Sequence, residues 1–337
     1  MKKILVTGVA GFIGYFLCKK LASLGHQVIG IDNINDYYDK NLKIDRLVNL
    51  GFDLNDINNK ETSFSKLKNS SIKFIKCNLE DRIFLPKIFK ENKFDIVCNL
   101  AAQAGVRYSI ENPNCYVDTN VVGFLNILEC CRNFNIKRIV YASSSSVYGN
   151  HLDTPYSELQ QVDKPISLYA ATKKSNELMA HVYSELYNIE TIGLRFFTVY
   201  GPYGRPDMAP MLFTNAIFSN NPIKVFNSGN LSRDFTYIDD IIEGVVLSIF
   251  GKINKNYQIF NIGKGEPISL LKFIEKLETE IGIKANKIMM PMQPGDVNKT
   301  LSDCSALANQ FDYKPKTNFG EGIKQFINWY KKYYKKQ

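Results

Sequence analysis

Short β-branched runs alternate with helical stretches over the first 194 residues of the chain. The runs that predict strands are Ile4 to Thr7, Val28 to Asp32, Ile72 to Lys76, Ile96 to Leu100, Ile139 to Ala142 and Thr191 to Leu194. Strand-sized apolar runs separated by helical patterns are typical of βαβ units, which build parallel sheets. We therefore predict an α/β fold in which residues 1–194 form a doubly wound parallel sheet with helices on both faces.

The pattern changes in the second half of the chain. After Gly201 the elements become shorter, the apolar spacing between Ile238 and Ile249 predicts a helix, and Tyr257 to Ile262 predicts a strand that can return to the main sheet. We therefore expect residues 234–262 to rejoin the first domain. Residues 195–233 and 263–337 are expected to form a smaller, interleaved C-terminal region that caps a binding site. Earlier in the chain, the polar segment 33–71 carries apolar positions between Leu42 and Leu50 that suggest one short helix.

Composition narrows the class of protein. The chain has 337 residues, 45% of them apolar, and a formal charge of +9. That length can bury a large core, and no uncharged apolar stretch of about 18 residues is present to span a bilayer. Seven cysteines without paired or zinc-like spacing fit a reducing cytosol, so we expect a soluble, cytoplasmic protein with no metal and no membrane partner. The basic residues are scattered and match no nucleic-acid reader motif.

A glycine-rich turn follows the first predicted strand. Gly8, Gly11 and Gly14 stand between that strand and a helix running towards Leu24. At this spacing, glycines close the turn and let the backbone approach a pyrophosphate at the helix N-terminus, as in Rossmann dinucleotide-binding sheets. Asp32 ends the second strand, where a carboxylate can accept hydrogen bonds from the adenosine ribose and would repel a 2′-phosphate. We therefore predict NAD as the cofactor.

Serines and a Tyr-Lys pair carry the candidate chemistry. Ser143 to Ser146 follow a predicted strand, and Tyr169 and Lys173 lie four residues apart at the start of a predicted helix, on one helix face. A nearby ammonium, together with a nicotinamide charge, can lower the pKa of a tyrosine enough to make it a usable base. A serine hydroxyl can hydrogen-bond the same substrate oxygen.

With these motifs in this order, nearly the whole chain resembles the extended short-chain dehydrogenases. The resemblance implies that Tyr169 is the acid/base, Lys173 orients the nicotinamide ribose and Ser144 is the catalytic hydroxyl. It also implies a full set of cofactor contacts: Gly8, Gly11, Phe12, Ile13, Gly14, Asp32, Asn33, Asn78, Leu79, Leu100, Ala101, Ala102, Gln103, Asn120, Tyr169, Lys173 and Phe196. Asn78 departs from the aspartate common in the family at the adenine amine, although its side-chain oxygen can accept the same bond.

The residues after the catalytic hydroxyl favour an epimerase within this family. Dehydratases that resemble this chain carry Asp-Glu there, whereas this sequence has Ser145 and Ser146. Related uronate decarboxylases place a glutamate at the position of Ser146, so that reaction is also disfavoured, though less strongly. Reversible oxidation at C4 needs only the tyrosine, the cofactor and room for the keto-sugar to turn.

Three stretches resemble UDP-glucuronate 4-epimerases: residues 31–38, 101–109 and 201–209. Because a uronate carboxylate calls for a charge-assisted donor, Arg205 is assigned to it, with Thr198, Ser145 and Ser146 as candidate hydroxyl donors. The resemblance also implies that the UDP moiety is held near Arg233 and Asp296. Phe226 and Arg107 are further candidates for substrate binding.

Several alternatives remain open from the sequence. A UDP-glucose or UDP-N-acetylglucosamine 4-epimerase would use the same chemistry on a neutral sugar, and a UDP-glucuronate decarboxylase is related. A non-catalytic NAD-sensing protein is a reading of another class, but the presence of Ser144, Tyr169 and Lys173 argues against it. Apolar helices at 117–131 and 168–187 resemble the dimer-forming pair of the family, so a homodimer is expected.

Overall fold

The central sheet has eight strands in the order β11-β7-β6-β5-β1-β2-β4-β3. A computed structural model describes residues 1–58, 63–67, 71–293 and 296–336. The strands of this sheet are β1 (Lys3–Thr7), β2 (Gln27–Asp32), β3 (Ser63–Phe64), β4 (Ile72–Lys76), β5 (Ile96–Asn99), β6 (Arg138–Ser144), β7 (Glu190–Phe196) and β11 (Tyr257–Ile262). All neighbours pair in parallel except β3 and β4. The predicted α/β, doubly wound parallel sheet is confirmed.

Alternating side chains of the parallel strands feed two separate cores. Ile4 and Val6 of β1 belong to one buried cluster, whereas Leu5 between them belongs to the other. Because successive residues of a strand point to opposite faces, a parallel strand covered on both sides is apolar at nearly every position. This explains why the strands appear in the sequence as continuous runs without a polar alternation.

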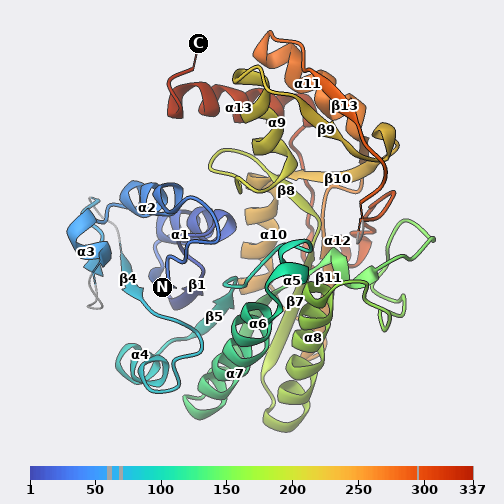
Figure 1. Cartoon of the computed structure of the whole chain (residues 1–337). Coiled ribbons are helices and arrows are strands. Elements are labelled where there is room, and N and C mark those ends of the chain that lie inside the picture. The colour runs from blue at the N-terminus through green and yellow to red at the C-terminus, as the bar shows by residue number, and fades with distance from the viewer. Residues whose placement is uncertain (59–62, 68–70, 294–295, 337) are drawn as a thin grey trace.

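Helices cover both faces of the sheet (Figure 1). The helices before residue 200 are α1 (Phe12–Ser23), α2 (Lys40–Asn49), α3 (Leu54–Asn58), α4 (Phe84–Asn92), α5 (Tyr108–Glu111), α6 (Pro113–Tyr116), the π-helix η1 (Val117–Gly123), α7 (Phe124–Asn133), the 3-10 turn η2 (Ser145–Tyr148) and α8 (Leu168–Tyr187). The insertion after β2 contains the expected helix as α2. It also contains α3 and β3, which the polar sequence of this segment did not suggest.

The second half of the chain builds two small sheets beside the main one. Its strands are β8 (Thr198–Tyr200), β9 (Ile223–Val225), β10 (Ser232–Tyr237), β12 (Pro267–Ser269) and β13 (Lys287–Met289), arranged as β12-β10-β8 and β13-β9. The helices are α9 (Ala209–Phe218), η3 (Phe226–Gly229), α10 (Ile238–Phe250), α11 (Leu270–Ile281), α12 (Ser305–Phe311) and α13 (Phe319–Tyr333). In Figure 1, the helices α9, α11 and α13 and the strands β9 and β13 lie together at the top of the view, away from the main sheet.

Residues 238–262 return to the main sheet. α10 packs against α1, and β11 pairs in parallel with β7 from Tyr257 opposite Thr191 to Ile262 opposite Phe196. The expected boundary at residue 234 falls inside β10, which spans Ser232–Tyr237 and belongs to the second sheet. The chain therefore passes from the second sheet back to the main one after β10, where α10 begins.

Candidate functional site

One large cavity opens at the carboxyl ends of the central strands, beside the point where the chain reverses its direction of winding. Starting from β1, the chain adds β2 and β4 on one side of this strand and then β5, β6 and β7 on the other side. Ligands of doubly wound sheets bind at this switch point. The empty volume, including the solvent at the mouth, is about 1710 Å³.

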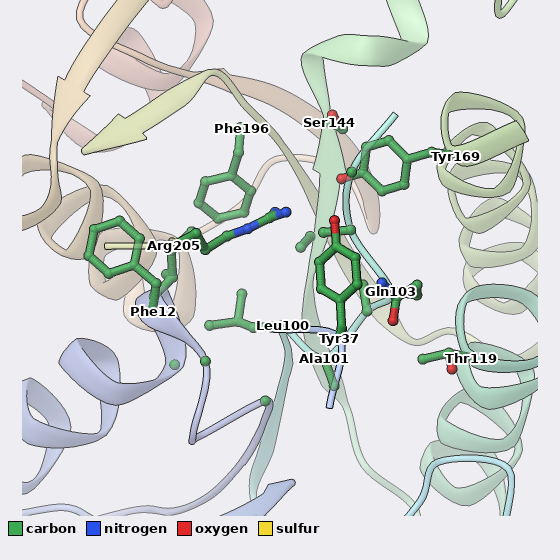
Figure 2. A pocket seen from close by; sticks show the side chains of 18 of the residues that line it. Phe12, Tyr37, Leu100, Ala101, Gln103, Thr119, Ser144, Tyr169, Phe196 and Arg205 are labelled. Atoms are coloured by element: carbon green, nitrogen blue, oxygen red, sulfur yellow. The ribbon is translucent and has the colours of Figure 1, made fainter. Parts of the chain in front are cut away.

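Most of the predicted site residues line this cavity. They are Gly8, Gly11, Phe12, Ile13, Gly14, Asp32, Asn33, Leu79, Leu100, Ala101, Ala102, Gln103, Ser144, Ser145, Ser146, Tyr169, Lys173, Phe196, Thr198 and Arg205. Figure 2 shows several of their side chains converging on the same space from different elements. The cofactor motif and the candidate catalytic residues are therefore parts of one site.

The glycine turn at the start of α1 has no room for side chains. Gly8 has a φ of +76°, and a Cβ on Gly14 would lie 2.1 Å from the carbonyl oxygen of Gly8. The backbone N–H of Gly8 donates to the carbonyl of Ile31 at the end of β2 (2.8 Å), which fixes the turn to the sheet. The bare backbone at the N-terminus of α1 thus lines the cavity, where N–H groups and the helix dipole favour a phosphate.

Asp32 is held against this turn by backbone hydrogen bonds. Its Oδ2 accepts from the N–H of Ala10 (3.1 Å) and its Oδ1 from the N–H of Ile34 (2.8 Å). The pairing leaves the remaining lone pairs of the carboxylate for a ligand hydroxyl. Lys43, which the sequence did not single out, also lines the cavity, and its ammonium donates to the carbonyl of Asn35 (2.8 Å). Burial lowers the pKa of Lys43, while the nearby charge of Asp32 opposes that change.

Asn120 supports the loop after β5 instead of lining the cavity. Its Oδ1 accepts from the N–H of Gln103 (2.8 Å), and its Nδ2 donates to the carbonyl of Gln103 (2.9 Å) and to Thr172 Oγ1 on α8 (3.1 Å). The residue lies in the π-helix η1, and Asn176 Nδ2 donates to its backbone carbonyl (2.6 Å). Asn120 therefore joins the predicted cofactor loop to the helix that carries Tyr169 and Lys173.

Lys173 is buried and anchored to β6. Its Nζ donates to the carbonyl of Ala142 (2.8 Å), and only 2% of the residue is exposed. Because burial penalises an ammonium, the pKa of Lys173 is lowered to about 7. Near neutral pH this lysine can therefore exchange between the ammonium and the neutral amine.

The phenol of Tyr169 is poised between Ser144 and Arg205. Burial raises the pKa of Tyr169, while a hydrogen bond with Ser144 and the charge of Arg205 oppose that increase. We expected the opposing charge to come from Lys173, but the cation that acts on the phenol here is Arg205. Figure 2 shows Tyr169 and Ser144 on one wall of the cavity and Arg205 reaching in from the other side.

Arg205 is already paired within its own loop. Its Nε donates to Asp207 Oδ1 (3.0 Å) and its Nη2 to Asp207 Oδ2 (2.5 Å). Tyr37, from the loop after β2, donates its hydroxyl to the same Asp207 Oδ2 (2.9 Å). Arg205 nevertheless lines the cavity, as Tyr37 does, and 23% of its side chain is exposed.

The four residues predicted to hold the remaining part of the substrate form a separate cluster. Arg233 Nη2 donates to Asp296 Oδ1 (2.5 Å), and Arg107 Nη2 lies 4.0 Å from Asp296 Oδ2. The guanidinium of Arg107 also lies over the ring of Phe226, 5.5 Å from its centroid. The cluster connects the loop after β5 with the second half of the chain. It adjoins the cavity, because Arg107 directly follows Val106, which lines the cavity.

Two residues predicted to contact the cofactor, Asn78 and Asn120, do not line the cavity, and sequence reasoning missed several residues that do. Asn78 is exposed and is not among the residues that line the cavity, whereas its neighbours Cys77, Leu79 and Glu80 are. The missed lining residues include Asn35, Tyr37, Tyr38, Lys43, Gly105, Thr119 and Met208. Tyr37 and Tyr38 stand in one of the stretches that resemble UDP-glucuronate 4-epimerases, and that resemblance was the available signal for them.

A family model described as GDP-mannose 4,6 dehydratase matches residues 5–326. The chain belongs to this family. It is 49% identical to Protein CapI of Staphylococcus aureus over 99% of this chain and all of that one. It is 40% identical to a probable UDP-glucuronate 4-epimerase of Rhizobium meliloti (strain 1021) over 99% of this chain and 98% of that one.

A solved structure has the same fold. It is the UDP-glucuronic acid 4-epimerase from Bacillus cereus in complex with UDP-glucuronic acid and NAD, which is 33% identical and superposes with a TM-score of 0.88 over 98% of this chain and all of that one. The predicted relationship to NAD-dependent nucleotide-sugar epimerases of the extended short-chain dehydrogenase type is confirmed.

The described residues contain neither a membrane-spanning helix nor a metal cluster. None of the helices within the ranges given above is long and apolar enough to cross a membrane. Over the same ranges, no group of three or more His, Cys, Asp or Glu side chains is arranged to hold a metal ion.

Proposed function

We propose that this chain is an NAD-dependent UDP-glucuronate 4-epimerase, which interconverts UDP-glucuronate and UDP-galacturonate through a 4-keto intermediate. The observation that carries the proposal is the meeting of Tyr169, Ser144 and Arg205 in one cavity that also contains the glycine turn. Similarity to the enzymes of Rhizobium meliloti and Bacillus cereus supports the same substrate.

The residues present fit a dinucleotide. A Cβ at Gly8, Gly11 or Gly14 would meet backbone atoms at 2.9 Å or less, so only glycines leave the backbone bare where a pyrophosphate would lie. Asp32 would hold the adenosine ribose, and Lys173 and Tyr169 would hold the nicotinamide end. NAD bound there would supply the hydride acceptor for the reversible oxidation at C4.

Tyr169 accepts the proton of the C4 hydroxyl when the sugar is oxidised and gives it back when the sugar is reduced. Ser144 donates to the same sugar oxygen and holds it against the phenol. Burial raises the pKa of Tyr169, and the charge of Arg205 opposes that increase. The turn after β6 offers hydroxyls at Ser145 and Ser146, which line the cavity, and no carboxylic acid. This composition disfavours the loss of water between C5 and C6.

Arg205 has a second task that a uronate imposes. The 4-keto intermediate is a β-keto acid, and if its C5–C6 bond aligns with the carbonyl π system, that bond breaks, its electron pair moves to C5 and the C4 oxygen, and carbon dioxide leaves. A guanidinium paired with the carboxylate keeps the negative charge on the acid and fixes its plane. Arg205 therefore both selects the uronate and protects it from decarboxylation.

The test is to incubate the purified protein with UDP-glucuronate, UDP-glucose and UDP-N-acetylglucosamine in parallel and to identify the products by NMR. We expect UDP-galacturonate from the first substrate and at least about tenfold slower turnover of the neutral sugars, because they leave one edge of the guanidinium without a partner. Epimerisation of UDP-glucose with no UDP-galacturonate formed would overturn the proposed substrate.

We also propose a cytoplasmic homodimer that associates through η1, α7 and α8. Leu178, Val182 and Leu186 follow one another at four-residue spacing on α8 and are 57%, 47% and 68% exposed. A regular apolar stripe on a helix favours packing against another helix. The double variant Leu178→Glu with Leu186→Glu should shift the mass measured by light scattering from dimer to monomer, whereas an unchanged mass would exclude this face.

A further inference from the structure

Within the described residues, the guanidinium of Arg205 is held along one edge, by Asp207. Asp207 accepts from Nε and Nη2 in a side-on, bidentate pair, so the Nη1 edge is not used by this carboxylate. Planar guanidinium groups bind carboxylates along either edge. The free edge belongs to a side chain that lines the cavity and whose charge acts on Tyr169.

A second residue, Tyr37 from the loop after β2, also fixes Asp207. Tyr37 donates its hydroxyl to Asp207 Oδ2, and its ring packs on Tyr108 with the centroids 4.9 Å apart. Both oxygens of Asp207 are therefore engaged, Oδ1 by Arg205 and Oδ2 by Arg205 and Tyr37. Figure 2 shows Tyr37 standing between Gln103 and Arg205 in the middle of the view.

Gly105 leaves the space in which this arrangement forms. Its φ is +110°, and a Cβ built on it would lie 2.6 Å from the hydroxyl of Tyr37 and 3.6 Å from Arg205 Nη2. Any side chain at this position would push Tyr37 away from Asp207. Three loops, which follow β2, β5 and β8, thus contribute to the placement of one guanidinium.

The charges of this group balance. Burial raises the pKa of Asp207, but the charge and hydrogen bonds of Arg205 outweigh that effect and leave it lowered. Burial, and then the charge of Asp207, raise the pKa of Tyr37. At neutral pH the group therefore consists of a cation, an anion and a neutral hydroxyl donor. Asp207 reduces the attraction of Arg205 for anions while it fixes the direction of the free edge.

We propose that Asp207 and Tyr37 are positioning residues for the uronate carboxylate: they hold one edge of Arg205 so that the other edge meets the sugar in a fixed orientation. This inference rests on the proposed function. A guanidinium free to rotate would still attract the carboxylate, but it would not fix the plane of the acid relative to the C4 carbonyl. Asp207 thus lowers the affinity for the uronate, and Asp207 and Tyr37 together limit decarboxylation.

Asp207→Asn separates affinity from orientation. The amide removes the negative charge that competes with the substrate, so the Kd for UDP-glucuronate, measured by calorimetry, should fall by about fivefold at low salt. The Kd for UDP-glucose should stay the same. Because Arg205 is no longer held side-on, the share of UDP-pentose among the products should rise at least about tenfold. A purely structural role would instead weaken both sugars together and leave the product ratio unchanged.

Tyr37→Phe is the milder variant, and it keeps the test decisive if Asp207→Asn does not fold. It keeps the ion pair and removes one hydrogen bond to Asp207, so we expect an unchanged Kd and a pentose share about two- to fivefold above that of the unmodified protein. Asp312→Asn is the matched control, because Asp312 is 81% exposed at its side chain and lies outside the cavity. It should change neither quantity.

The outcomes separate this inference from the proposed function. If the unmodified protein forms no UDP-galacturonate, the proposed function fails. If it does, but Asp207→Asn and Tyr37→Phe both keep its product ratio and its preference for the uronate, the positioning role is wrong while the epimerase remains.

Discussion

Two arginine–carboxylate pairs of this protein share one geometry and differ in their surroundings. Arg195 donates from Nε and Nη2 to Glu177 at 2.8 and 2.9 Å, much as Arg205 does to Asp207. The side chains of the first pair are 4% and 1% exposed, and those of the second are 23% and 27% exposed. The pair of Arg195 and Glu177 is buried inside the fold, whereas Arg205 of the other pair lines the cavity.

The remaining donors of the two arginines mark the difference. Arg195 Nη1 donates to the hydroxyl of Tyr148 (3.0 Å), and Glu177 also accepts from Ser143 Oγ (2.6 Å). This network ties α8, β6 and β7 together next to Ser144, and it uses Nε, Nη1 and Nη2 of the guanidinium. The free edge of Arg205, by contrast, lies at a cavity. The same type of ion pair therefore supports the fold in one place and is available for recognition in the other.

The largest effect is expected from breaking the inner pair. Glu177→Gln should lower the free energy of unfolding by about 3–5 kcal/mol, because it leaves a buried guanidinium without its countercharge. Replacing both partners by apolar residues, Arg195→Met with Glu177→Leu, should recover much of that loss. Denaturant unfolding of the three proteins measures both values. A loss below about 1 kcal/mol in the single variant would show that the pair is not important for stability.

Breaking the outer pair should affect activity more than stability. Arg205→Ala is expected to lower kcat/KM for UDP-glucuronate by about 100-fold, because it removes a charge-assisted contact to the carboxylate. It should raise the fraction of decarboxylated product and cost only about 1 kcal/mol of stability. Steady-state kinetics with product analysis and a thermal melt test this expectation. Unchanged turnover with no pentose would remove Arg205 from the site.

A third buried cation sharpens the comparison, because its pKa moves the other way. Burial favours a lower pKa for all three cations. At Arg205 and Arg195 the carboxylate partners outweigh this effect, and the pKa of each arginine is raised. At Lys173 no carboxylate of the described residues offsets this effect, and burial lowers its pKa from 10.5 to about 7. Between these two values the unfolded chain binds the proton that the folded chain releases, so this group adds stability as pH rises. The gain between pH 7 and 9 should be about 2 kcal/mol.

Lys173→Met measures this contribution. The variant should lack that part of the rise between pH 7 and 9, so its unfolding free energy should depend less on pH than that of the unmodified protein. Urea melts at pH 7, 8 and 9 provide the comparison. Parallel pH profiles for the two proteins would mean that Lys173 keeps its ordinary pKa in the fold.

The sequence predicted the scaffold well because parallel strands leave a strong local signal. The strands at 72–76 and 257–262 have the predicted bounds, and β7 continues two residues beyond its predicted end at Leu194. Short elements were missed: α3 and β3 lie in a polar segment where tertiary contacts, more than periodicity, decide the structure. The helix expected at 117–131 begins as the π-helix η1, a change of winding that the apolar spacing does not reveal.

The candidate site was predictable where residues follow one another in a motif. Gly8, Gly11 and Gly14, or Tyr169 and Lys173, are defined by their spacing. The contact of Tyr37 with Asp207 joins residues 170 positions apart, and no local pattern encodes it. The roles of Arg195 and Arg205, ten positions apart, differ only through what the fold places around each.

The central claim is that the sugar is oxidised and reduced at C4 alone. UDP-glucuronate carrying deuterium at C4 tests it directly, with NMR of the product formed in ordinary water. The account predicts UDP-galacturonate that keeps its deuterium at C4 with the configuration inverted, because the hydride that leaves this carbon returns to it. Loss of the label to solvent, or inversion at a different carbon, would contradict the account.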